Sequence, residues 1–273
     1  MAEPVQFHRG NRAEYLARFA LGTVGYVAPV PREADRFGVD LFLHLGKLEK
    51  AGMKVTGPTL AFQVKSSKSD IKLEDGKGLR SFFDDLLPFY IAHVDARDDK
   101  LEIYNTHNRI GHGYYPLVKK LTLKLKREPP RCKQNDPSKS SHRYHLGEPI
   151  ASLKISALDG DDWERYAASL HEVLLSWCQL DLSNLAFKLM GVSIIAHPPV
   201  DYEINKPLDL DRVFYGSIRH PELRKRAAVF LNRIAHSLAN YFEPANGDNN
   251  LKAIIEACGA CKCATNSWLS PSA

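Results

Sequence analysis

The chain has 273 residues, of which 44% are hydrophobic and 25% charged, and its formal net charge is +5. The length suffices for one large domain or two modest ones, and the composition is that of a globular protein, which argues against a disordered or fibrous chain. The mildly basic charge permits an anionic partner such as nucleic acid, although a solvated surface explains it equally well.

No apolar run is long enough for a transmembrane helix, and the first residues lack the apolar core of a signal peptide. We therefore expect no membrane partner. The chain holds five cysteines, and an odd number argues against a disulfide framework. These features favour the reducing environment of the cytoplasm.

Residues 11–22 have the pattern of a helix of about three turns. Asn11 is the candidate N-cap and Gly22 the candidate C-cap, and the apolar residues between them recur at helical spacing. Glu14 lies in the first turn, where a carboxylate stabilises the helix dipole. A short strand over residues 23–31 follows and ends at its prolines.

Residues 41–45 and 60–65 alternate in the two-residue period of strands, and the charged, glycine-containing connection between them predicts a β-hairpin. Successive side chains of a strand point to opposite faces of the sheet. Gln63 and Lys65 therefore point in the same direction, away from the apolar face of the second strand.

An antiparallel register in which Asp40 lies across from Gln63 and Lys65 puts the centre of the turn near residues 51–53. Gly52 can adopt the positive φ that such a turn uses. The register brings a carboxylate, an amide and an ammonium together at one end of the hairpin, and these groups can hold a divalent cation and neutralise a phosphate.

Asp40, a strand-length gap and then Gln63-Val64-Lys65 resemble the D…(E/Q)-x-K core of the PD-(D/E)XK nucleases. The variant with glutamine is similar to the Mrr-type restriction nucleases and to small nuclease-like domains of bacterial defence proteins. The resemblance covers roughly the first 110 residues. It implies an α/β, restriction-endonuclease-like fold with a mixed sheet flanked by helices.

The resemblance also implies a Mg²⁺- or Mn²⁺-dependent phosphodiesterase that cleaves nucleic acid, DNA in the first place. Asp40 would bind the cation together with Gln63, the Val64 carbonyl and Glu14 from the preceding helix. The cation would polarise the scissile phosphate and lower the pKa of a bound water. Lys65 would orient or deprotonate that water and stabilise charge on the phosphate. For Glu14, stabilisation of the helix dipole stays an equal alternative.

A helix and two further strands complete the predicted core. Residues 78–87 have helical spacing, and residues 89–94 and 101–104 read as strands separated by a turn at Asp98-Asp99. Helices before and between four strands predict an α/β sandwich around a mixed sheet, an order that suits the restriction-endonuclease-like fold.

Cationic and hydroxyl side chains follow these strands. Ser67 and Lys68 would contact a phosphate backbone, although such a segment is more often a plain loop. Lys124 and Lys126 alternate with leucines, which predicts a strand with one basic face for phosphates; an edge strand protected by lysines explains the pattern equally well. Arg109, in a Gly- and Asn-rich loop, is a further candidate near the substrate.

Composition divides the chain into a nuclease-like core over residues 1–128, a proline- and serine-rich boundary over 129–147, a mainly helical module over 148–256 and a tail over 257–273. The helical module is expected to pack on the core, with homo-oligomerisation or a defence-system partner protein as alternatives. The tail contains Cys258, Cys261 and Cys263. Their spacing resembles half of a zinc site, but a structural site needs four ligands.

The sequence thus favours a metal-dependent endonuclease. Gln63 stands where the resembled nucleases more often have glutamate, which removes one negative charge from the site. For this reason a non-catalytic nuclease-like module that binds nucleic acid or a protein partner is the alternative function. An assembly protein that uses its helical part is the third.

Overall fold

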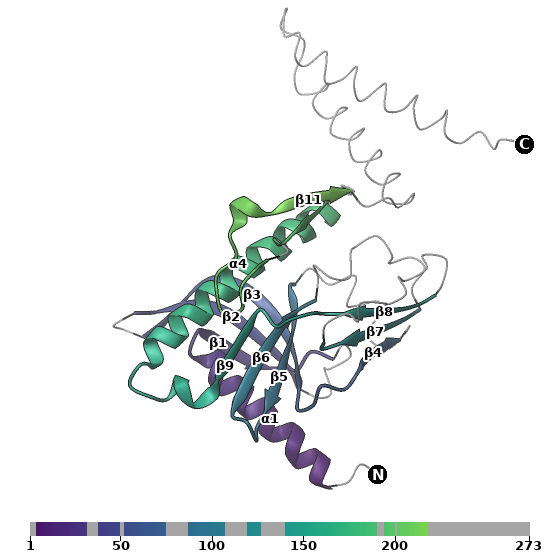
Figure 1. Ribbon diagram of the computed structural model, residues 1–273. Helices are drawn as coiled ribbons and strands as arrows, with labels where there is room; N and C mark the ends of the chain where they lie inside the picture. Colours follow the sequence, from purple (N-terminus) through teal and green to yellow (C-terminus); the bar gives the residue numbers. More distant parts are fainter. Residues whose placement is uncertain are drawn as a thin grey trace, which may run out of the picture.

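The computed structural model describes residues 4–31, 38–49, 52–74, 87–106, 119–126, 140–189, 194–199 and 201–217. They form an α/β structure built on a mixed sheet, as predicted (Figure 1). Among these residues, no helix is both long and apolar enough to cross a membrane.

The central sheet has six strands in the spatial order β1-β2-β3-β5-β6-β9. All neighbours are antiparallel except β3 and β5, which run parallel. A parallel pair needs a crossover connection, and here the crossover contains a strand of a second sheet. The strands of the central sheet are β1 (Gly25–Pro29), β2 (Leu41–Glu49), β3 (Gly52–Lys65), β5 (Phe89–Asp95), β6 (Lys100–Asn105) and β9 (Ala151–Lys154).

Different layers cover the two faces of the central sheet. Helices α1 (Pro4–Gly22) and α4 (Trp163–Leu189) pack on one face and share its apolar cluster. A three-stranded sheet in the order β4-β7-β8 covers the other face and shares a second cluster with it. Its strands are β4 (Ile71–Glu74), β7 (Lys120–Lys124) and β8 (Ser141–His145). Helices were predicted to flank the sheet, but in the described part they cover one face only.

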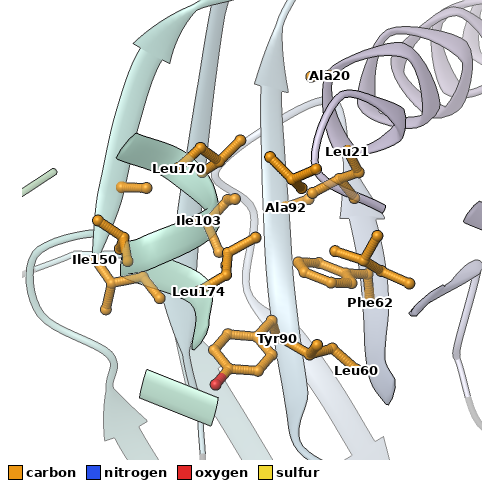
Figure 2. Packing of buried hydrophobic residues seen from close by; sticks show 14 of the residues in the cluster. Ala20, Leu21, Leu60, Phe62, Tyr90, Ala92, Ile103, Ile150, Leu170 and Leu174 are labelled. Atoms are coloured by element: carbon orange, nitrogen blue, oxygen red, sulfur yellow. The ribbon is translucent and has the colours of Figure 1, made fainter. Parts of the chain in front are cut away.

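The core on the helical face contains the largest buried side chains of β3 and β5 (Figure 2). The rings of Phe62 and Tyr90 stack with their centroids 5.5 Å apart. Above them α1 presents alanines at helical spacing, among them Ala13, Ala17 and Ala20, all fully or almost fully buried. Small side chains let the helix backbone approach the sheet closely, so α1 is held against β1, β3 and β5.

The predicted strands 23–31, 41–45, 60–65, 89–94 and 101–104 are confirmed as β1, β2, β3, β5 and β6. The bounds of β1 are shorter than predicted, and those of the other four strands are longer. The predicted start of the first helix at Asn11 is wrong, since α1 begins at Pro4. Proline is tolerated in a first turn because the N–H it lacks has no helical partner there.

Several predictions lie wholly or mainly outside the described residues: the helix over 78–87, the loop that holds Arg109, and everything beyond residue 217, including the cysteine tail. How the chain divides into domains stays a prediction. However, β9 and α4, which follow the proposed boundary, are built into the core of the preceding part. Two short strands, β10 (Ile194–His197) and β11 (Phe214–Ser217), form a separate antiparallel pair that contacts α4 through β10.

Strand β9 lies at the edge of the central sheet, where an unpaired backbone invites association with another chain. The side chain of Asn205 occupies this edge: its Oδ1 accepts from the Ser152 N–H at 2.6 Å and its Nδ2 donates to the Ser152 carbonyl at 2.7 Å. The Asn205 N–H also donates to the Ile150 carbonyl. Asn205 has φ of +64°, a conformation that asparagine tolerates better than most residues. One amide thus replaces part of a seventh strand.

A buried carboxyl on α4 joins this helix to the central sheet. Asp181 is fully buried, and its Oδ2 accepts hydrogen bonds of 2.7 Å from the Tyr90 hydroxyl on β5 and from Nδ2 of Asn105 on β6. Burial raises the pKa of the Asp181 carboxyl to about 7, although both hydrogen bonds oppose the shift. The two hydrogen bonds to Asp181 hold α4 against the middle of the central sheet.

This raised pKa makes stability depend on pH. The folded protein retains the Asp181 proton where the unfolded chain has lost it, so stability falls as pH rises from about 4 through about 7. The Asn side chain of Asp181→Asn cannot ionise. We therefore expect the free energy of unfolding of this variant, relative to that of the parent, to rise over this pH range by an amount on the order of a few kcal/mol. Urea unfolding at several pH values measures the difference, with the exposed Asp159→Asn as control. A difference in the free energy of unfolding that does not change with pH would contradict the raised pKa of Asp181.

Candidate functional site

The first component of the site is Asp40, which directly precedes β2. Leu41 pairs with Phe62, the Asp40 N–H donates to the Phe62 carbonyl at 2.8 Å, and the Asp40 carboxylate reaches the Val64 N–H, so Asp40 lies across from the last residues of β3. The predicted antiparallel register is therefore confirmed at this end of the hairpin. At the other end the strands are paired as far as Glu49 and Gly52, earlier than the predicted turn centre, because the register shifts after His44.

The Asp40 carboxylate also bonds to the backbone of β3. Its Oδ2 accepts from the Val64 N–H at 2.6 Å. The N–H and C=O of one residue in a strand point to the same side, so the Val64 carbonyl points toward Asp40 as well. The carboxylate thus stands in place of a further residue of β2 and ends the pairing of the two strands.

Gln63 is the second component. Its side chain is buried, and its Oε1 has no hydrogen-bond partner among the described residues. Space for the amide depends on Gly38, which has φ of +71°: a Cβ at that position would lie 2.8 Å from Gln63 Nε2. The GVD segment therefore allows the amide to lie against the turn that leads to Asp40. An unpartnered buried oxygen is costly and calls for a donor or a cation.

Lys65 is the third component, and it lies two residues beyond Gln63 on the same face of β3. It is partly exposed, next to His93 in the parallel register with β5. Within the described part of the chain, its ammonium forms no hydrogen bond or ion pair.

Glu14, the fourth predicted residue, forms no hydrogen bond or ion pair with this group among the described residues. It lies on α1, whose neighbouring Ala13 and Ala17 pack on the helical face of the sheet, whereas Gln63 and Lys65 belong to the opposite face. The structure thus brings together Asp40 and Gln63, with Lys65 beyond them, from the four residues that sequence suggested.

A polar cluster beside Lys65 was missed from the sequence. Glu102 on β6 lies opposite His93 on β5 and is 5% exposed. Its carboxylate accepts from Lys68 Nζ and Lys100 Nζ, each at 2.7 Å, and from the Tyr104 hydroxyl at 3.1 Å, and it lies 3.2 Å from His93 Nδ1. The alternation of Lys100, Glu102 and Tyr104 predicts one polar face, but the partners from β5 and the loop are visible only in three dimensions.

The charges of this cluster follow from its contacts. Burial raises the pKa of the Glu102 carboxyl, but hydrogen bonds from Lys100 and Lys68 outweigh it and lower the pKa from 4.5 to about 2. Burial lowers the pKa of the His93 imidazole, although Glu102 opposes the shift. At neutral pH the cluster is thus a carboxylate held between two ammonium groups.

The predicted nucleic-acid contacts have different surroundings. Ser67 and Lys68 follow β3 and are exposed, with Lys68 bonded to Glu102. Lys124 lies 3.3 Å from Asp70, while Lys126 is exposed. Because β7 lies between β4 and β8, the alternative of a lysine-protected edge strand is wrong. Acidic residues next to β7 neutralise part of its basic face.

The oxygen atoms near Asp40 are those that a hard cation prefers. A carboxylate, the unpartnered amide oxygen of Gln63 and the carbonyl of Val64 fit Mg²⁺, which binds proteins through one or two carboxylates and keeps several waters. The described residues contain no group of three or more His, Cys, Asp or Glu side chains that could hold a metal. A cation here would therefore depend on neutral oxygens besides Asp40.

Comparison of the chain with protein-family models, with curated proteins and with solved structures finds no match.

The Glu102 cluster predicts a second dependence of stability on pH. Glu102→Gln leaves Lys68 and Lys100 without their counterion, and we expect a loss of about 1.5–3 kcal/mol at pH 7. Since the pKa of Glu102 is lowered, its contribution is present above pH 4.5 and is lost as pH falls toward about 2. The difference in the free energy of unfolding between Glu102→Gln and the parent should shrink over that acidic range. Denaturant unfolding against pH measures it, with the exposed Glu172→Gln as control; equal stability at pH 7 would refute the role of the cluster.

Proposed function

We propose that this chain is a metal-dependent phosphodiesterase that cleaves nucleic acid, DNA in the first place, on a restriction-endonuclease-like fold. The observation that carries the proposal is the register of β2 and β3. It sets Asp40 across from the last residues of β3, which include Gln63 and Lys65. The buried Oε1 of Gln63 lacks a partner among the described residues, and Lys65 lies on the same face of β3 as Gln63. The order α1, β1, β2, β3 and then the parallel β5 supports the fold.

Each residue has a stated task in this proposal. Asp40, Gln63 Oε1 and the Val64 carbonyl hold Mg²⁺ or Mn²⁺, and the bound cation supplies Lewis-acid polarisation of the scissile phosphate. Lys65 places a positive charge where the phosphate oxygens become more negative and orients the attacking water. Its lack of a carboxylate partner in the described residues supports this task, because an ammonium already in an ion pair would have to give up that partner first.

A non-catalytic nuclease-like module that binds nucleic acid or a protein is the second candidate. Two observations favour it: the Asp40 carboxylate already accepts from the Val64 N–H, and the described residues contain no group of three or more His, Cys, Asp or Glu side chains that could hold a metal. In this module Asp40 ends a strand pair and Lys65 contributes to an anionic-ligand surface. A part in bacterial defence, for either candidate, rests on the sequence resemblance alone.

Cleavage of plasmid DNA with Mg²⁺ or Mn²⁺, and with EDTA as control, tests the proposal. We expect metal-dependent nicking that Lys65→Ala lowers by about 10²–10³-fold, since the variant removes charge stabilisation at the phosphate. Asp40→Asn keeps an oxygen for the Val64 N–H but loses the anionic ligand, so it should fold like the parent and cleave poorly.

Two comparisons make this test specific. Lys154→Ala removes an exposed lysine of β9 and should cleave as the parent does. If Asp40→Asn and Lys65→Ala both cleave at the parental rate, the site is assigned wrongly. If the parent binds DNA without cleaving it in any metal, the binding module is favoured instead.

A further inference from the structure

A hollow of about 520 Å³ opens at the ends of β3 and β5. Four segments line it: α1 with Arg12, the loop after β3 with Ser66, Ser67 and Lys68, the end of β5 with His93, and the β5–β6 turn with Arg97. Because β3 and β5 are parallel, their carboxyl ends lie at the same edge of the sheet. Open α/β sheets bind ligands outside the carboxyl ends of parallel strands.

Three cationic side chains and one carboxylate, that of Asp95, line the hollow. Arg12 and Arg97 are exposed, and within the described residues neither guanidinium donates a hydrogen bond to a carboxylate. Lys68 is committed to Glu102, which fixes the loop from which Ser67 projects. Asp95 also lines the hollow, but its Oδ1 accepts from two backbone N–H groups of its own turn.

These donors match a tetrahedral oxyanion. A guanidinium presents several N–H donors in a fixed fork and binds phosphate through two parallel hydrogen bonds, and serine hydroxyls add contacts that read no base. We propose that the hollow binds a phosphate of the nucleic-acid backbone, with Arg12 and Arg97 as its principal contacts. This subsite rests on the proposed function, because it takes nucleic acid as the ligand. It adds the place where the nucleic-acid backbone would lie on the protein.

The position of the hollow relates it to the catalytic residues. Ser66 directly follows Lys65, and His93 is the neighbour of Lys65 in the register. A backbone that crosses the carboxyl end of β3 can therefore place one phosphate near Lys65 and another in the hollow. Arg12 and Arg97 would hold the strand without contacting the proposed cation ligands around Asp40.

The test measures binding in EDTA, so that it does not depend on cleavage. A labelled DNA duplex is titrated by fluorescence anisotropy at several salt concentrations with the parent and with the double variant Arg12→Gln/Arg97→Gln. We expect the double variant to bind at least about tenfold more weakly in low salt. The slope of log affinity against log salt should be shallower by about one unit, because both arginines contact the same phosphate.

The control is Arg18→Gln, which removes an arginine of the same helix that stacks on Tyr15 and does not line the hollow. Thermal unfolding checks that all variants fold. Parental affinity and salt dependence in the folded double variant would overturn the subsite. So would polyglutamate that binds the parent as tightly as DNA does and loses the same factor of affinity in the double variant. Arginine-dependent DNA binding without any metal-dependent cleavage would support the subsite and count against the proposed enzyme alone.

Discussion

The parallel pairing of β3 with β5 determines where this protein can place polar chemistry. Both strands lie in the middle of a sheet that is covered by helices on one face and by a second sheet on the other. Where the two strands begin to pair, side chains on both faces are therefore apolar, as at Ala61, Phe62 and Tyr90. Only toward their carboxyl ends do Gln63, Lys65 and His93 replace them. The polar residues concentrate where the double cover ends, which is where a ligand can reach them.

Two buried carboxyl groups show how surroundings decide charge. Glu102 lies on the face covered by the second sheet and is surrounded by two ammonium groups, so it stays ionised. Asp181 lies on the helical face, where the donors are a hydroxyl and an amide, and burial dominates. A neutral donor satisfies a carboxyl oxygen without compensating the loss of hydration of a charge. The same side-chain chemistry thus serves as an anchor for cations on one face and as a packing contact on the other.

Asp40 combines a structural contact with its proposed task. Its carboxylate ends the pairing of β2 and β3 through the Val64 N–H, and the same contact turns the Val64 carbonyl to its side of the strand. Removal of the whole side chain would disturb both the strand end and the oxygen cluster. Charge and hydrogen bonding at Asp40 can be separated only by an isosteric amide, because the amide keeps the acceptor and removes the charge.

Local periodicity in the sequence determined the strands of the central sheet, the face to which Gln63 and Lys65 belong, and the register that sets Asp40 across from the last residues of β3. These features follow from neighbours along the chain, since side-chain alternation sets the face of each residue, although the shift in register after His44 was not predicted. Tertiary structure alone decided that β7 is a central strand, that α1 lies on the face opposite Lys65, and that Glu102 gathers its partners. It also formed the hollow from four separate segments. Such contacts join residues far apart in sequence, and no local pattern encodes which of many compatible pairings the packed core will select.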